Sequence, residues 1–141
     1  MAELRMERRF AAAPEKVFTF VTENQGLLKW WLPPGMSMGD QALDLTRPGP
    51  WHCVMIHPER GEFHMSGQVR QVDPPALVEF TMNVPGVEGD DSVVRFELAD
   101  DGAGGTNFAL VQSGISEQMA EMGKMGWAGP LDQLEALVNA A

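Results

Sequence analysis

The sequence predicts an α+β domain in which a curved antiparallel sheet of seven strands surrounds a long C-terminal helix, with two short helices between the first and second strands. Two observations support this. Apolar residues recur at helical spacing in the last stretch, Ser113 to Ala141, whereas most of the chain up to Gln112 alternates between apolar and polar residues. The apolar helical face needs a cover, and a sheet of this length is expected to curl around it.

The C-terminal helix carries an apolar stripe of about seven turns. Pro130 lies inside it, removes one backbone hydrogen bond and crowds the preceding turn, so we expect a kink near Gly126 to Pro130. Such a kink would act either as a hinge over a cavity or as a fit of the helix to a bent sheet. The stripe consists of Ile115, Met119, Met122, Trp127, Leu131, Leu134 and Val138.

The N-terminal part of the chain predicts one strand and two short helices. Glu3 to Phe10 alternates as a half-buried strand does, and Pro14 suits the first turn of a helix because its missing N–H costs nothing there. The triplet Asn24-Gln25-Gly26 breaks the helical pattern, and a second helical piece, Leu27 to Trp31, ends before Pro33.

Six further strands, separated by turns rich in Gly and Pro, account for the chain before the last helix. No internal repeat or linker interrupts them, so residues 1–141 are expected to form one domain. Pro85 to Asp90 is expected as a loop. The expected strands are Met38 to Thr46, Trp51 to His57, Glu62 to Val72, Leu77 to Val84, Ser92 to Ala99 and Thr106 to Gln112.

Charge and composition exclude several classes of partner. The formal net charge of −10 repels phosphate backbones and anionic lipid headgroups, so we expect neither a nucleic acid nor a membrane as a partner. No apolar run approaches the roughly 18 residues of a membrane span, and the charged start does not resemble a signal peptide. The single cysteine, Cys53, excludes an internal disulfide. We therefore expect a protein of the cytoplasm.

Short motifs distributed over nearly the whole chain carry a family resemblance. They include Arg8-x-Phe10, Pro14-Glu15-x-Val17-Phe18, Trp30-Trp31-x-Pro33, Asp44-Leu45, Val72-Asp73-Pro74-Pro75, Ser92-x-Val94-x-Phe96, Gly105-Thr106 and Gly126-Trp127. At these positions the chain resembles the activator-of-Hsp90-ATPase-like branch of the START/Bet v 1 (SRPBCC) superfamily. The resemblance implies a helix-grip fold with a cavity for hydrophobic or amphipathic small molecules between sheet and C-terminal helix. Fold alone does not fix function in such a diverse superfamily.

Large apolar side chains that face inward are the candidate lining of this cavity. Each one alone is better explained by core packing, but the set is large for the space between one helix and one sheet, and its thioethers adapt to irregular ligands. The candidates are Trp31, Met38, Trp51, Cys53, Met55, Phe63, Met65, Phe80, Met82, Phe96, Phe108, Met119, Met122 and Trp127.

Arg8 is the most informative polar residue because it lies on the apolar face of its strand and needs a partner. The meander that the resemblance implies would place the second strand beside the first and bring Asp44 within reach. We expect a structural ion pair between Arg8 and Asp44 at the cavity wall. The alternative is that Arg8 anchors a carboxylate or hydroxyl group of a ligand.

The sequence gives no strong signal for a metal, a cofactor or a catalytic residue. His52 and His57 are five positions apart and face opposite sides of one strand, and His64 lies on the polar side of another. Zinc needs three or four converging ligands. Cys53 has no neighbouring base in sequence and is expected as a small buried hydrophobe. We therefore expect no metal, cofactor or catalytic residue.

Three functions fit these observations. The first is a non-enzymatic carrier or sensor of a small hydrophobic or amphipathic molecule. The second is an enzyme similar to polyketide cyclases and aromatases, which would need inward acid or base groups, and Arg8, Asp44 and Gln112 are the candidates. The third is a protein-binding module similar to the Hsp90 co-chaperone domain. The Trp30-Trp31 pair would form either a homodimer contact or the cavity rim.

Overall fold

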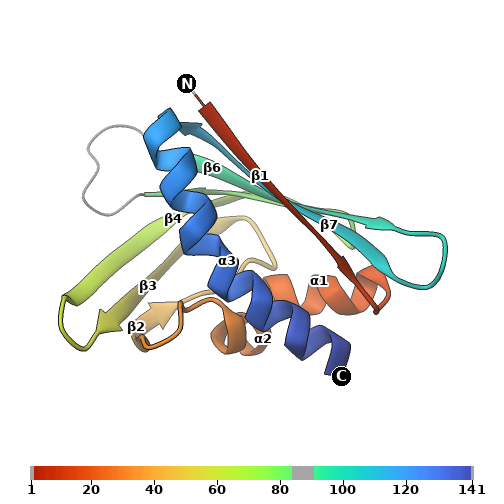
Figure 1. Cartoon of the computed structure of the whole chain (residues 1–141), viewed down its shortest axis with the longest axis horizontal. Helices are drawn as coiled ribbons and strands as arrows, with labels where there is room; N and C mark the ends of the chain where they lie inside the picture. Colours follow the sequence, from red (N-terminus) through yellow and green to blue (C-terminus); the bar gives the residue numbers. More distant parts are fainter. Residues whose placement is uncertain (1, 84–90, 141) are drawn as a thin grey trace.

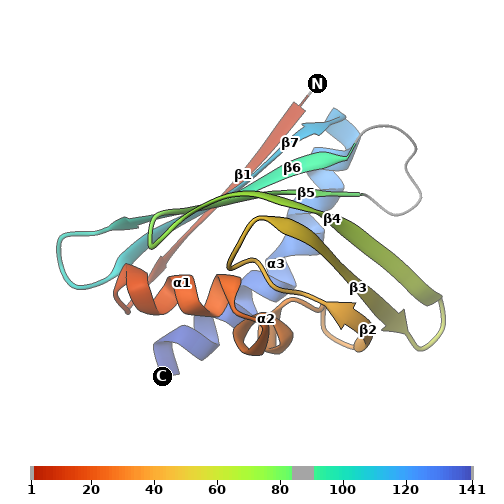
Figure 2. The ribbon, with the colours of Figure 1, turned by 180° about the vertical axis from the view of Figure 1, so that it is seen from behind.

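The protein folds as a seven-stranded antiparallel sheet with three helices on one of its faces, in a computed structural model that describes residues 2–83 and 91–140 (Figures 1 and 2). The predicted fold class is confirmed. The elements in chain order are β1 (Ala2–Phe10), α1 (Pro14–Thr22), α2 (Asn24–Trp30), β2 (Ser37–Ala42), β3 (Gly49–His57), β4 (Gly61–Asp73), β5 (Leu77–Met82), β6 (Ser92–Asp100), β7 (Thr106–Ile115) and α3 (Glu117–Ala140).

The strand order is β1-β7-β6-β5-β4-β3-β2, so β1 and β2 form opposite edges of the sheet. The strands from β2 to β7 follow one another as neighbours, and β1 joins at the end by pairing with β7. This pairing sets Leu4 opposite Gln112 and Phe10 opposite Thr106. Directly opposed residues share a face, so the even-numbered residues from Thr106 to Gln112 point to the core. The sequence alone does not fix this facing, because Phe108 and Leu110 alternate with the equally apolar Ala109 and Val111.

Helix α3 runs diagonally across the sheet, with α1 and α2 beside its C-terminal half (Figure 1). Its buried side includes the predicted stripe from Trp127 to Val138. The amide of Gln133 donates a hydrogen bond of 2.7 Å to the carbonyl oxygen of Leu32 and so fixes the segment after α2 against α3. The helix is continuous through Pro130, and the kink expected there stays a prediction.

The start of α3 differs from the expected one. Residues 113–115 extend β7 instead, with Ser113 paired to Glu3 and Ile115 paired to Ala2. Gly114 adopts a φ of 78° between them, a conformation that glycine tolerates without steric cost. Met122 is 56% exposed, so its prediction as an inward residue was wrong. Helical spacing predicts that one side of a helix is apolar. In the first part of α3 it does not determine which residues form the buried side.

The second helix begins at Asn24, not at Leu27 as expected. Gly26 does not break it; a Cβ at this position would lie 2.7 Å from backbone atoms of Phe20, so the glycine permits close packing between α1 and α2. The strand expected over Met38 to Thr46 is also shorter. The chain leaves the sheet after Ala42 because Leu43 and Leu45 turn into the core, and the Leu45 amide donates to the Thr22 carbonyl oxygen at 2.9 Å.

The other predicted strands agree with the observed ones to within a few residues. The predicted loop Pro85 to Asp90 lies outside the described residues. Among the described helices, none is long and apolar enough to cross a membrane.

Candidate ligand-binding pocket

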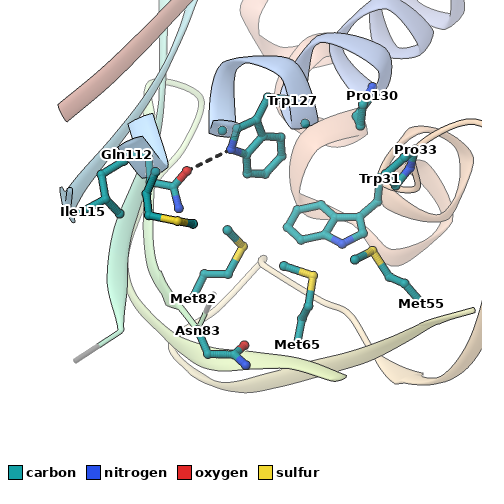
Figure 3. Close-up of a pocket in the computed structure, with 13 residues that line it drawn as sticks. Trp31, Pro33, Met55, Met65, Met82, Asn83, Gln112, Ile115, Trp127 and Pro130 are labelled. Carbon is teal, nitrogen blue, oxygen red and sulfur yellow. Dashed lines mark hydrogen bonds between the residues drawn. The ribbon is translucent and has the colours of Figure 1, made fainter. Parts of the chain in front are cut away.

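A pocket of about 210 Å³ lies between the first half of α3 and the sheet. Strands β3, β4, β5 and β7 form its floor and one side, α3 covers it, and the segment after α2 bounds the opposite side (Figure 3). The lining residues among the described part of the chain are Trp31, Pro33, Met55, Met65, Met82, Asn83, Gln112, Ile115, Met119, Gly123, Gly126, Trp127 and Pro130.

Methionines form the adaptable wall of the pocket. Met55, Met65 and Met82 come from three neighbouring strands (Figure 3). Met119 contributes to the lining from α3. Strand alternation brings Met65 and Met82 to the core side of β4 and β5, where both are buried. Unbranched thioether side chains change rotamer at low cost, so this wall can follow the shape of different ligands.

Trp31 and Trp127 form the less adaptable walls. Trp31 follows the last residue of α2, and its ring packs edge to face on Trp51 at a centroid distance of 5.7 Å. Trp127 lies on the buried face of α3 and packs on Phe96 at 6.4 Å. Both indoles are therefore held by the aromatic core behind the pocket, and their positions are set before any ligand enters.

Gln112 is the one buried polar side chain among the described lining residues. Its Oε1 accepts a hydrogen bond of 3.1 Å from Nε1 of Trp127, and its Nε2 donates to Oγ of Ser92 at 2.9 Å. The Ser92 hydroxyl in turn donates to the carbonyl oxygen of Met82 at 2.8 Å. This chain of hydrogen bonds gives each of these buried side-chain nitrogen and oxygen atoms at least one partner.

Asn83 reaches the pocket from its more exposed side. Its Oδ1 accepts from the Ser66 amide at 2.7 Å, and its Nδ2 donates to the His64 carbonyl oxygen at 3.1 Å. The side chain thus continues the pairing of β5 with β4 beyond the last residue of β5. Its role here is structural.

None of the described residues that line the pocket is ionisable. General acid–base catalysis needs a titratable group within hydrogen-bond reach of the reacting atom. The apolar wall and single buried amide instead suit binding. Groups of three or more His, Cys, Asp or Glu that could hold a metal ion are absent from residues 2–83 and 91–140.

The structure distributes the predicted cavity residues over three environments. Those that line the pocket are Trp31, Met55, Met65, Met82, Met119 and Trp127. Those buried in the packed core behind it are Trp51, Cys53, Phe80, Phe96 and Phe108. Those that lie outside both are Arg8, Met38, Asp44, Phe63 and Met122, of which Met38 packs partly buried against the core.

The expected ion pair between Arg8 and Asp44 is wrong. Arg8 lies on β1 and Asp44 follows β2, and these strands are at opposite edges of the sheet. The guanidinium of Arg8 instead lies 3.6 Å from the carboxylate of Asp132 on α3 and donates to the carbonyl oxygen of Glu7. Asp44 accepts hydrogen bonds from the amide and hydroxyl of Thr46, and the hydroxyl contact is the main reason its pKa is lowered.

Two of the three histidines lie beside carboxylates on the surface of the protein. His52 pairs with Asp40, and His64 pairs with Glu62, both on exposed surface.

Trp30 and Trp31 are both buried, and Trp31 lines the pocket, so the pair fits the rim alternative. A homodimer stays a prediction without support from these residues.

Sequence reasoning missed several lining residues. Gln112 was a candidate polar group, but the apolar residues on both sides of β7 hid its direction. Gly123 and Gly126 carry no apolar signal, although glycines in mid-helix are costly and so suggest a special role. Alternation with Phe80 and Met82 predicts Asn83 on the outer face of its strand. Its position just after β5 lets the side chain reach both the neighbouring strand and the pocket.

A curved antiparallel sheet closed by a C-terminal helix, with an apolar pocket between the two, defines the helix-grip class of the SRPBCC superfamily, a fold that commonly binds hydrophobic ligands. The chain belongs to the activator of Hsp90 ATPase homolog 1-like family, whose sequence model matches residues 11–139. Among curated proteins, none matches the chain.

Solved structures support this assignment. The chain is 35% identical to the AHSA1 protein of Silicibacter pomeroyi, with 96% of each chain covered and a TM-score of 0.86. It is 26% identical to a protein of Nitrosomonas europaea, with 98% of this chain and 94% of that chain covered and a TM-score of 0.80. A protein of Chromobacterium violaceum is 25% identical over 99% of each chain, with a TM-score of 0.85.

Proposed function

We propose that the protein binds a small hydrophobic or amphipathic molecule in the pocket beneath α3 and acts as a carrier or sensor, not as an enzyme. The observation that carries this proposal is the lining itself. Methionine and tryptophan side chains surround about 210 Å³ of space, and the described lining contains no ionisable group. A concave apolar site with few polar groups is typical of small-molecule binding.

The pocket volume limits the ligand. An apolar cavity of about 150 Å³ in another protein holds benzene. At about 210 Å³, this pocket has room for one ring with a short substituent or for a short alkyl chain. Longer ligands would extend through the open side of the pocket or displace the flexible methionines.

A cyclase-like enzyme is less well supported. Its chemistry needs acid or base groups that face the substrate. Arg8 pairs with Asp132 outside the pocket, Asp44 contacts Thr46, and Gln112 does not titrate. No observation on the described surface favours the third function, binding of a protein partner.

The direct test is native mass spectrometry of the purified protein, in which a retained small molecule would appear as an added mass. A titration with ethylbenzene, followed by tryptophan fluorescence, then measures whether the pocket accepts an apolar ring. We expect saturable quenching or shift of the emission, because Trp31 and Trp127 line the pocket.

A matched pair of variants separates pocket binding from surface binding. Gly126 borders the pocket and is exposed, so Gly126→Leu adds a large side chain with free space around its Cβ and should weaken ethylbenzene binding. Met125→Leu changes a neighbouring residue that is 81% exposed and lies outside the lining, so it should bind normally. Equal binding by both variants would show that the probe binds elsewhere, and the proposal would fail.

A further inference from the structure

Gln112 determines which polar group a ligand of this pocket can carry. The side chain is 4% exposed, lies on β7 and reaches the pocket from its buried end. In Figure 3 its amide points toward Trp127 across the space above Met82. It is the only described lining residue that is both polar and fully surrounded by protein.

The partners of Gln112 fix the orientation of its amide. An indole N–H can only donate, so the oxygen of Gln112 must face Trp127. The proton of the Ser92 hydroxyl is directed to the Met82 carbonyl oxygen, which leaves the hydroxyl free to accept from Nε2 of Gln112. The two ends of the amide are thus assigned by independent contacts that agree with each other.

The same amide keeps hydrogen-bonding capacity for a ligand. A primary amide has two N–H donors and two acceptor lone pairs. Contacts with the described residues occupy one N–H, which donates to Ser92, and one lone pair, which accepts from Trp127. One donor and one acceptor position remain in a setting where an unmade hydrogen bond is costly. A hydroxyl group matches both, because it can donate and accept.

The uncharged lining and the volume of the pocket restrict which ligands can bind. A charged group would lose its hydration in a lining that, over residues 2–83 and 91–140, offers no opposite charge. The ligand is therefore neutral. The volume of about 210 Å³ admits one aromatic ring with a short substituent, since about 150 Å³ suffices for benzene.

Gly126 indicates where part of this ligand lies. A Cβ on Gly123 would approach Leu4 to 2.5 Å, and a Cβ on Gly129 would approach Pro34 to 3.0 Å, so both glycines are required by packing. A Cβ on Gly126 would meet nothing within 4 Å. Packing within the described protein does not demand a glycine there, and its backbone borders the pocket.

Building on the proposed function, we infer that the pocket selects a neutral, single-ring molecule with a hydroxyl group, such as a simple alkylphenol. The Gln112 amide binds the hydroxyl at the buried end. The ring lies among the methionines and against the bare backbone of Gly126. Gln112 is the specificity-determining residue for the polar group, and Gly126 leaves room for the ring.

Calorimetric titration with matched probes tests this inference. 4-Ethylphenol, ethylbenzene and 4-ethylbenzoate share one skeleton and differ in a hydroxyl, a hydrogen and a carboxylate. Wild-type protein should bind 4-ethylphenol roughly 2- to 12-fold more tightly than ethylbenzene, as one net hydrogen bond predicts. It should bind 4-ethylbenzoate at least about tenfold more weakly than 4-ethylphenol, because the carboxylate has no counter-charge.

The variant Gln112→Leu should bind 4-ethylphenol no more tightly than ethylbenzene, because the buried hydroxyl then lacks the amide partner. This change also removes a hydrogen-bond partner from Ser92 and from Trp127 and can destabilise the protein. If the variant does not fold, the comparison of 4-ethylphenol with ethylbenzene in the wild-type protein provides the test. Equal affinity of wild-type protein for 4-ethylphenol and ethylbenzene would overturn the hydroxyl inference and leave the pocket function standing. A preference for 4-ethylphenol that survives in Gln112→Leu would also overturn it. Absence of binding by both neutral probes would overturn the pocket function itself.

Discussion

Trp31 and Trp127 meet edge to face at one side of the pocket, with ring centroids 5.6 Å apart and ring planes at 88°. This contact joins the end of α2 to the middle of α3, two elements that are far apart in the sequence. Trp31 also packs on Phe80 at 6.2 Å, so the pair connects α3 to the sheet. The pocket therefore has one side held by aromatic contacts and another formed by flexible methionines.

Substituting Trp127 by Phe should destabilise the protein through the loss of one hydrogen bond and of part of the buried ring volume. An aromatic ring remains, but Oε1 of Gln112 loses the indole donor that lies 3.1 Å away in a buried setting. An acceptor left without its partner costs about 1–3 kcal/mol. Urea denaturation should show this decrease in the free energy of unfolding.

A double-mutant cycle provides the control. Gln112→Leu removes the acceptor, so adding Trp127→Phe to it should cost less than Trp127→Phe alone costs in the wild-type background. Strictly additive effects would contradict a hydrogen bond of energetic importance between these residues.

Much of the fold could be predicted because alternation in strands and spacing in helices are local properties of the sequence. Strands β4 to β6 have one clearly buried face, and the stripe from Trp127 to Val138 follows one side of α3. The error over Arg8 had a non-local cause. Its partner depends on which strand closes the sheet, and no short pattern records that β1 pairs with β7.

Only some of the residues that line the pocket could be predicted from the sequence. Alternation shows which side chains face inward, but it does not show which of them border open space. Met65 and Met82 follow from alternation. Phe80 and Phe96 alternate equally well, yet they pack on each other at 5.3 Å and fill the core. The boundary between filled core and open pocket depends on side-chain packing in three dimensions. The direction of Gln112 became known only from its register with Leu4, since β7 carries apolar residues on both faces.

Gly126→Ala should stabilise the protein while weakening ligand binding. Alanine is more favourable than glycine in a helix interior by about 0.8–1.0 kcal/mol, and the added Cβ meets nothing within 4 Å. The methyl group also projects from a backbone that borders the pocket. Thermal unfolding should show a higher midpoint, and calorimetry should show weaker binding of ethylbenzene.

Gly123→Ala is the matched comparison, three residues earlier on the same helix. Here the Cβ would lie 2.5 Å from Cδ2 of Leu4, a fully buried side chain with little freedom to move. Overpacking should cost about 1–3 kcal/mol and outweigh the gain in helix propensity. If both substitutions change stability in the same direction, the distinction between the two glycines is wrong.

Asp101 should make stability depend on acidic pH. Its carboxylate accepts hydrogen bonds from the amides of Ala103 and Gly105 and pairs with Arg9, and these contacts lower its pKa. A lowered folded-state pKa means that the contribution to stability is present above the unfolded value of about 4 and is lost as pH falls through the folded value.

The variant Asp101→Asn should keep an acceptor oxygen for the two amides but lose the charge opposite Arg9. We expect it to be less stable than the wild-type protein at pH 7, by a margin that shrinks as pH falls below about 4, measured by urea denaturation at pH 7 and at pH 2. A stability difference that stays constant between these pH values would exclude titration of Asp101 as the cause.

Cys53 should make stability decrease at alkaline pH. Its thiol is 1% exposed, and burial raises its pKa from 9.0 to about 11, opposed by a contact with the Trp31 side chain. Because the folded-state pKa lies above the unfolded one, this contribution to stability is complete below about pH 9 and is lost as pH rises toward 11. The sequence contains no tyrosine, so no phenol titrates in the same range.

The full effect of this shift of the pKa is about 3 kcal/mol, of which only part develops by pH 10. Urea denaturation at pH 8 and pH 10 should show wild-type protein losing more stability than Cys53→Ala over the same interval. The alanine variant starts from a lower value, since the smaller side chain leaves space in the core, so the slopes and not the absolute values are compared. Parallel slopes in the two proteins would mean that Cys53 does not cause the alkaline loss. The Cys53 thiol would then be as easily ionised in the folded state as in the unfolded chain.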